Sequence, residues 1–586
     1  HRDTLFAVMD LEAKLNNWEA VIHAKRSLCE KTQDEKERLN LLSEIGEIYR
    51  DKLKNPQKAI AAFSEALEID RGNHAILQAT LELYSETKQW KKVVDVLLQF
   101  VEVEADSRRK AKYYYTAGTI SRDEIKALDE CVEYYNLALD NNHSDNLKAF
   151  EALDKILTQK KDWKQLERNY RRMIKRLKPG ENNGLMVMLL HNLGEIYRSR
   201  MKDFNAAIET FELAAQLEPD NLQRHEILAE LYEVAGPDRL DKAIEHHQTL
   251  ITASPYRFES YHKLFHIYME TRQYDKAWCL ASALSFLKKA EPDERQLYDQ
   301  YKQKGFVRAK QRMSDELWQR HVYAREENKL LGLLFGLMAG AVANVKSRPY
   351  KDWKIKRKDK RDIATDQLLF SKVFNYVCQV LNLPDIPELF LRQEMRGGMQ
   401  IATANEKGQL IPFVVVGADL LQGRPEKDLA YTIARELSFM RPDHFILKSV
   451  QTVAELKVLL FSAMKMVNPK VQMQAELVPS VDATAGQLAK LLPPQHLEQI
   501  AAVVKKMAEA NDPADLGAWL QAVDYSANHA GFILCNDMEV AAAIIAREPV
   551  PVGGLPAKEK VKELVLYAIS EQYFEVRTQL GLSIVG

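Results

Sequence analysis

Arg435 and Glu436 lie in a segment, residues 428–440 (DLAYTIARELSFM), whose apolar spacing predicts a helix. A carboxylate on a helix can act as a general base when a metal-bound water or a nucleophile lies beside it. Glu436 has an arginine beside it instead, and a lone glutamate in this setting is most simply structural. The sequence also contains no GxxxxGKS/T loop, no GxGxxG turn and no GxSxG segment. It therefore carries no complete motif for catalysis or nucleotide binding.

A second candidate for chemistry is a basic segment, residues 346–361 (KSRPYKDWKIKRKDKR), with nine basic residues against two acidic ones. Clustered cations gain most against phosphate groups, so one interpretation is a contact surface for nucleic acid, acidic lipid or an acidic protein. The other interpretation is a solvated connector balanced by Asp352, Asp359 and Asp362. The sequence leaves both open. The candidate polyanion contacts are Lys346, Arg348, Lys351, Lys354, Lys356, Arg357, Lys358, Lys360 and Arg361.

Metal ligands are sparse in this sequence. The five cysteines are scattered without a CxxC pair, which fits neither a disulfide framework nor a zinc ribbon and favours a reducing cytosol. His444 and His529 could form a displaced metal site, but no third ligand is identifiable. Lys plus Arg (82) nearly equals Asp plus Glu (83), so no overall charge favours nucleic acid or a membrane as the main partner. We expect no metal and no cofactor.

The elements that would position these residues begin with a repeated pattern in the first half of the chain. The hexapeptide IGEIYR at 45–50 recurs as LGEIYR at 193–198. From the glycine of each copy, equal steps lead to alanine, phenylalanine and alanine. Three tryptophans, 72 and 73 residues apart, mark weaker units between the strong ones. The marker positions are Gly46, Tyr49, Ala59, Phe63 and Ala66 in one copy, Gly194, Tyr197, Ala207, Phe211 and Ala214 in the other, and Trp18, Trp90 and Trp163.

This pattern resembles the tetratricopeptide repeat (TPR), a unit of about 34 residues that forms two helices. The resemblance implies an α-solenoid of about eight helix pairs over residues 1–290. Small residues such as Gly46, Gly118 and Gly194 would let paired helices approach closely, and the tyrosines would fill the space between pairs. The family's concave face commonly holds an extended peptide or a partner helix.

The repeated pattern does not continue through the second half of the sequence. Residues 291–364 are predicted to form a helical connector that contains the basic segment and an apolar run, Leu330–Ala343, which is too short to span a membrane and is expected to be a buried helix. Residues 365–586 are predicted to form a smaller α+β domain. Its short strands are expected at 388–392, 399–403 and 411–416, separated by glycine turns. The overall fold class is therefore mainly α.

The strand ending in VGADLL at 416–421, followed by the helix with AREL at 434–437, resembles the zincin core of the heat-shock and prenyl-protein class of metallopeptidases. In that family the helix reads HExxH, and its two histidines bind zinc. Here Arg435 and Phe439 stand in the histidine positions. The family's later acidic ligand is matched by Asp524. The resemblance implies an inactivated site in which Arg435 pairs with Asp524, or with Glu436 as the alternative.

Together these features predict a cytoplasmic, non-catalytic scaffold or adaptor that binds other proteins or peptides, in a large multiprotein assembly. Nucleic acid is not expected to be its main partner, and no membrane span is predicted. Long chains with this arrangement resemble bacterial proteins. Two alternatives remain open: a metallopeptidase with a displaced or partner-completed metal site, and a polyanion-binding or nucleic-acid-binding adaptor that works through residues 346–361.

Overall fold

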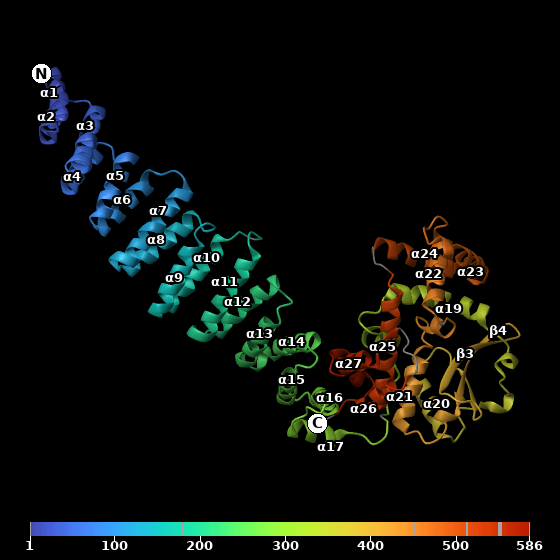
Figure 1. Ribbon diagram of the computed structural model, residues 1–586. Helices are drawn as coiled ribbons and strands as arrows, with labels where there is room; N and C mark the ends of the chain where they lie inside the picture. Colours follow the sequence, from blue (N-terminus) through green and yellow to red (C-terminus); the bar gives the residue numbers. More distant parts are fainter. Residues whose placement is uncertain are drawn as a thin grey trace. The chain divides into compact units, whose positions relative to one another are not determined.

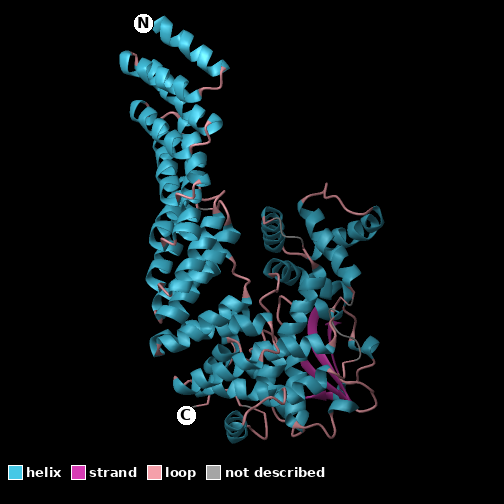
Figure 2. Ribbon diagram, turned by 60° about the vertical axis from the view of Figure 1, so that its left-hand side comes forward, coloured by secondary structure: helices cyan, strands magenta, loops and turns pink. Residues whose placement is uncertain are grey.

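The computed structural model describes residues 2–178, 180–306, 308–450, 452–510, 514–548 and 554–584. The chain divides into two compact units, His1–Pro237 and Asp238–Gly586. The first is a row of helices, and the second combines helices with one small sheet (Figures 1 and 2). The predicted fold class, an α-solenoid followed by a smaller α+β part, is confirmed.

The first unit is built of antiparallel helices that follow one another along a row (Figure 1). Several helices begin at Asp or Asn residues whose side chains accept a backbone N–H of the first turn, as Asn55 does from Lys58. The helices are α1 (Arg2–Lys14), α2 (Trp18–Lys31), α3 (Glu35–Glu47), α4 (Pro56–Ile69), α5 (His74–Glu86), α6 (Trp90–Val103), α7 (Ser107–Ile120), α8 (Leu128–Asn141), α9 (Leu147–Lys160), α10 (Trp163–Arg176), α11 (Asn183–Glu195), α12 (Phe204–Leu217) and α13 (Leu222–Ala235).

Long and short helix pairs alternate in this row. In each long pair the first helix continues into a π-helical turn: η1 (Ile48–Lys52), η2 (Ser121–Ile125) or η3 (Ile196–Met201). The predicted tryptophan markers begin the second helices of the short pairs, α2, α6 and α10. Lys52 of η1 lies 5.3 Å from the ring centre of Trp18, and Arg200 of η3 lies 5.0 Å from that of Trp163. The turns η1 and η3 therefore each place a cation over the tryptophan of the preceding pair.

The small residues of the repeated pattern lie at close helix contacts. A Cβ atom added at Gly194 would come within 2.7 Å of the Phe211 ring, and one at Gly46 within 2.4 Å of Phe63. Tyr197 bridges to the preceding pair, because its hydroxyl donates to Glu167 at 2.6 Å. The predicted roles of these residues are confirmed.

The second unit begins with three more helices of the same type, α14 (Leu240–Ala253), α15 (Phe258–Glu270) and α16 (Tyr274–Phe286), so the described residues contain sixteen such helices in all. α16 packs against the C-terminal helices of the chain, where buried Arg577 makes two hydrogen bonds of 2.9 and 2.7 Å to Asp275. The repeated pattern therefore continues beyond residue 237, where the compact units divide.

The sheet lies within the second unit (Figure 2). Its strands are β1 (Lys360–Arg361), β2 (Glu388–Arg392), β3 (Met399–Glu406) and β4 (Gln409–Gly417), in the order β1-β2-β4-β3. β2 and β4 are parallel, with Phe390 opposite Val415, and the other two pairings are antiparallel. The three predicted strands are present, and the basic segment supplies a fourth, β1.

Helices make up the rest of the second unit: α17 (Pro292–Tyr301), α18 (Asp315–Leu317), α19 (Lys329–Lys346), α20 (Leu369–Leu381), α21 (Glu426–Ser438), α22 (Val453–Val467), α23 (Val478–Leu491), α24 (Pro494–Glu509), α25 (Leu516–Cys535), α26 (Met538–Ile545), α27 (Ala557–Ala568) and α28 (Glu571–Gln579). Among the described helices, only α19 is long and apolar enough to cross a membrane. Its Leu331, Phe335 and Met338 are fully buried in a core shared with α22 to α25.

Candidate functional site

The predicted site residues lie where α21 crosses α25. The two helices approach closely at Gly531, where an added Cβ would lie 2.9 Å from the ring of Tyr431. This close approach brings Arg435 of α21 next to Asp524 of α25, 89 residues later in the sequence. The predicted contact between these two residues is confirmed, with Nη2 of Arg435 lying 2.6 Å from Oδ1 of Asp524.

Two further charged residues close a ring around this pair. Lys560 of α27 lies 2.6 Å from Oδ2 of Asp524 and 2.7 Å from Glu548. Glu548 in turn lies 2.9 Å from Nε of Arg435. Two cations and two carboxylates therefore alternate in a closed four-membered arrangement, which we call the charge ring. Arg435, Asp524 and Lys560 are at most 5% exposed, and Glu548 is partly exposed at the edge of the ring.

Polar neighbours complete the surroundings of the charge ring. Asn528 Oδ1 accepts hydrogen bonds from Tyr431 at 2.8 Å and from Nε of Arg435 at 2.9 Å. Burial raises the pKa of the Tyr431 hydroxyl well above its ordinary value, so this hydroxyl remains a hydrogen-bond donor. Burial also raises the pKa of Asp524, although Arg435 and Lys560 act in the opposite direction. The charges of the ring thus balance within the protein.

The carboxylate of Glu436 is paired with two cations. Its carboxylate accepts from Lys448 at 2.8 Å and from Arg435 at 3.2 Å. Burial alone would raise the pKa of Glu436, but the charges of Lys448 and Arg435 lower it below its ordinary value. A carboxylate held ionised by two cations is a poor proton acceptor near neutral pH. Phe439 belongs to the apolar core and does not join the ring.

The two histidines considered as metal ligands have separate partners. His444 Nε2 lies 2.6 Å from Glu327, whose other oxygen accepts a hydrogen bond from Ser526. His529 lies 2.8 Å from both the Val322 carbonyl oxygen and Glu563. Each ring thus binds a different carboxylate. Within the described residues, no group of three or more His, Cys, Asp or Glu side chains is arranged to hold a metal ion.

The basic segment covers one face of the sheet. Tyr350 and Trp353 pack on Phe413 of β4, with ring centres 5.4 and 5.6 Å apart. The aromatic residues of the segment are partly buried against the apolar core of the sheet. All nine basic side chains of the segment are exposed. Lys346 pairs with Glu455 and Lys360 with Glu388, both at 2.6 Å.

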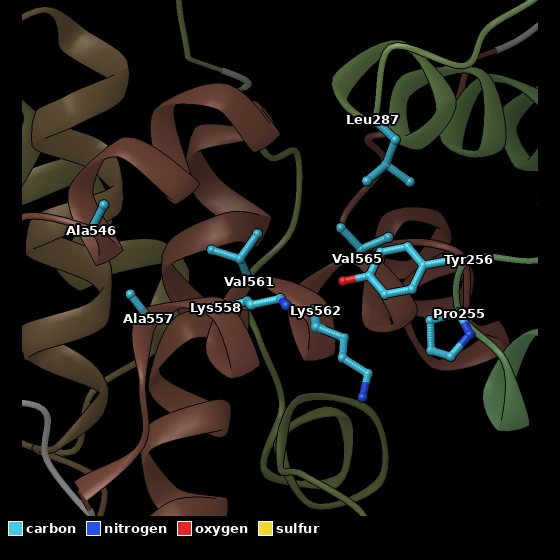
Figure 3. A pocket seen from close by; sticks show the side chains of 9 residues that line it. All are labelled: Pro255, Tyr256, Leu287, Ala546, Ala557, Lys558, Val561, Lys562 and Val565. Carbon is cyan, nitrogen blue, oxygen red and sulfur yellow. The ribbon is translucent and has the colours of Figure 1, made fainter.

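A small apolar pocket lies elsewhere in the second unit. Figure 3 shows its lining side chains, which come from Pro255 and Tyr256, from Leu287 at the end of α16, from Ala546 at the end of α26 and from α27. Its volume of about 290 Å³ falls at the lower limit for small-molecule sites. The polar side chains that line it belong to Tyr256, Lys558 and Lys562, and we assign it no chemistry.

Sequence reasoning missed Lys560 and Glu548 as members of the charge ring. One signal was available for Lys560, because it shares a face of α27 with buried Leu564 and Ala568 at helical spacing. A lysine in such an apolar stripe requires a buried carboxylate partner. Glu548 carries no comparable local signal.

Comparison with known proteins identifies repeats in the first unit. A family model described as tetratricopeptide repeat matches residues 39–73 and 189–221. These ranges include the two predicted hexapeptides, so the chain contains tetratricopeptide repeats, as the sequence pattern predicted. No curated protein matches the chain.

Several solved structures are similar to parts of this chain. The C-terminal part of a TPR repeat-containing protein from Cytophaga hutchinsonii is 14% identical and covers 44% of this chain and 97% of that one, with a TM-score of 0.23. YrrB, a TPR protein with an unusual peptide-binding site, is 17% identical. The match covers 35% of this chain and 98% of that one, with a TM-score of 0.20. A MamA fragment from Desulfovibrio magneticus RS-1 is 16% identical. The match covers 31% of this chain and 97% of that one, with a TM-score of 0.18.

Proposed function

We propose that this chain is a non-catalytic scaffold or adaptor that binds other proteins or peptides through its tetratricopeptide repeats. The observation that carries the proposal is the row of repeated helix pairs, two of which match the tetratricopeptide family model. A row of stacked helix pairs offers an extended surface with an apolar interior that is already filled. Such a surface suits recognition of another chain rather than chemistry on a small molecule.

We also propose that residues 365–586 derive from a zincin-like peptidase domain whose metal site has been lost, and that residues 291–364 join this domain to the repeats. The residues present do not fit zinc, because a guanidinium and a phenyl ring occupy the positions of the two histidine ligands. The charge ring supports the proposal, since it connects the same two helices that a metal would connect. The fold would then be retained for binding.

The cytoplasm is the compartment that this proposal favours. All five cysteines are free, and Cys131, Cys279, Cys378 and Cys535 are buried. Burial raises the pKa of the Cys131 thiol to about 11, so it stays protonated and unreactive near neutral pH. Buried, unpaired thiols are typical of proteins in a reducing environment.

Photo-crosslinking in the native cell tests the adaptor function on the intact protein. A photoreactive residue at Met188 of α11 (46% exposed) and, separately, at Leu213 of α12 (52% exposed) samples both helices of one repeat. Leu369 of α20 (43% exposed) is the matched position in the second unit. We expect discrete crosslinked protein partners from a repeat position. Crosslinks from Leu369 alone would contradict binding through the repeats.

Metal analysis separates the adaptor from the peptidase alternative. We expect the purified full chain to contain zinc far below one equivalent and to show no protease activity that a chelator abolishes. Stoichiometric zinc, together with chelator-sensitive peptide cleavage, would replace the adaptor with a peptidase that has a displaced or partner-completed site.

A further inference from the structure

A pocket of about 880 Å³ lies beside β1 and the turn between β3 and β4. We call it the sheet-edge pocket. Its volume falls in the range of sites that enclose small molecules. It is formed by three parts of the chain: the basic segment, β2, and the β3–β4 turn, which lies about 50 residues after the basic segment. The adaptor function does not use it.

Positive charge converges on this pocket. Five cations line it: Lys351, Lys356, Arg357 and Lys360 from the basic segment, and Lys407 from the turn. Two carboxylates, Glu388 and Glu406, also line it, which leaves an excess of three positive charges. Except for Lys360, which pairs with Glu388, none of the five cations has an ion-pair partner within 4.0 Å among the described residues.

Both carboxylates are already engaged by the protein. Glu388 binds Lys360 at 2.6 Å and accepts from the Tyr350 hydroxyl at 3.0 Å. Glu406 accepts from the backbone N–H of Tyr350 at 2.9 Å. Tyr350 itself packs on the sheet through Phe390 and Phe413. These contacts hold the floor of the pocket in place and leave the other four cations free to bind an external anion.

The shape of the charged surface favours a compact ligand. Lys346 and Arg348 line a separate pocket with Lys448, and Lys354 and Lys358 do not line the sheet-edge pocket. The nine cations of the segment therefore do not form one continuous track of the kind that follows a nucleic-acid backbone. They divide into groups, of which the group in the sheet-edge pocket is joined by Lys407.

We propose that the sheet-edge pocket binds a small, multiply charged phosphorylated anion. Lysine ammonium groups neutralise its charge, and the Arg357 guanidinium can donate two parallel hydrogen bonds to one phosphoryl group. The ligand class is defined by several phosphoryl groups on a molecule small enough to enter about 880 Å³. Inorganic tripolyphosphate is the simplest probe of this class.

Calorimetric titration of the full chain with tripolyphosphate tests the proposal. K356Q/R357Q removes two charges that line the pocket, and K354Q/K358Q removes two charges from the same segment that do not. We expect wild-type binding to weaken at least about tenfold in K356Q/R357Q, and by no more than about twofold in K354Q/K358Q. K407Q, from the distant turn, should also weaken binding several-fold.

Three results would overturn the proposal. One is no binding to the wild-type chain at about 50 mM salt, where electrostatic binding is strongest. Another is equal weakening by both double variants, which would indicate non-specific attraction. The third is tighter binding of a single-stranded oligonucleotide than of tripolyphosphate, weakened alike by both double variants, which would assign the segment to nucleic acid. Circular dichroism of each variant confirms that the fold is kept.

Discussion

Arg435 shows how one buried cation can connect several acidic side chains. Its guanidinium reaches Asp524, Glu548 and Glu436 from one planar group, which a lysine ammonium would not orient in the same way. The guanidinium also stays charged at any pH at which the protein is folded. The interaction between the helices therefore does not depend on metal.

Replacing Arg435 with alanine leaves Asp524 and Glu548 with Lys560 as their one remaining cation in the charge ring, so one negative charge there is uncompensated. Because an uncompensated buried charge is costly, we expect Arg435→Ala to lower the free energy of unfolding by about 3–5 kcal/mol. Urea denaturation of the full chain measures this. Arg320→Ala is the control: its pair with Glu316 is more than two-thirds exposed on both sides, and its loss should cost less than about 1 kcal/mol. Equal effects of the two changes would contradict a buried charge ring.

We expect the stability of the fold to depend on pH through Glu436. Its pKa is lowered in the folded chain by Lys448 and Arg435, so its ionised form stabilises the fold above the unfolded-state pKa of about 4.3. That contribution is lost as pH falls from about 4.3 through the folded-state pKa. Glu436→Gln should be less stable than wild type at neutral pH by about 1 kcal/mol, and the difference should shrink on acidification below about pH 4. Urea denaturation of both proteins at several pH values tests this, and a difference that is constant with pH would contradict the shift.

At the scale of elements, repeat geometry depends on the glycine that faces the aromatic ring of its partner helix. The distance of 2.7 Å from a Cβ at Gly194 to the Phe211 ring is too short for any side chain without movement of α11 or α12. Long pairs keep this contact while adding a π-helical turn, since the turn follows the glycine in sequence. The insertion therefore changes the length of the unit without changing its close helix contact.

We expect Gly194→Leu to lower the melting temperature of the first unit, with a cost of about 1–3 kcal/mol from overpacking. Gly184→Ala is the matched control on the same helix, because a Cβ at Gly184 has only Asn182 Oδ1 near it, at 3.8 Å. That change should be neutral or slightly stabilising, since alanine favours helix over glycine. A melting temperature of Gly194→Leu equal to that of Gly184→Ala would contradict the register of the repeats.

At the scale of the whole molecule, Gly194 and Arg435 lie in different compact units. We expect calorimetry of the full chain to resolve two transitions, because separate cores unfold as separate cooperative units. Gly194→Leu should move one transition and Arg435→Ala the other. A single transition that both changes move by similar amounts would indicate one cooperative unit instead.

Several features of this chain were determined by the sequence itself. The hexapeptides at 45–50 and 193–198, together with Trp18, Trp90 and Trp163, define the register of the helices, because close packing between neighbouring helices admits few residue types at these positions. The strands predicted at 388–392, 399–403 and 411–416 follow from local apolar runs bounded by turn residues, and in the structure the second and third extend to Met399–Glu406 and Gln409–Gly417. Local patterns of this kind need no knowledge of distant residues.

Only the tertiary structure decided which distant charges meet. Asp524 was predicted as a partner of Arg435, but Lys560 and Glu548 join them from other segments. The tertiary structure also places Lys407 beside the cations of the basic segment in the sheet-edge pocket. Removing charged groups from water is costly, and a buried ion pair repays this cost only where packing holds the opposite charges within about 3 Å of each other and other hydrogen bonds satisfy them. That condition depends on how α21, α25 and α27 pack, and no local spacing in the sequence expresses it.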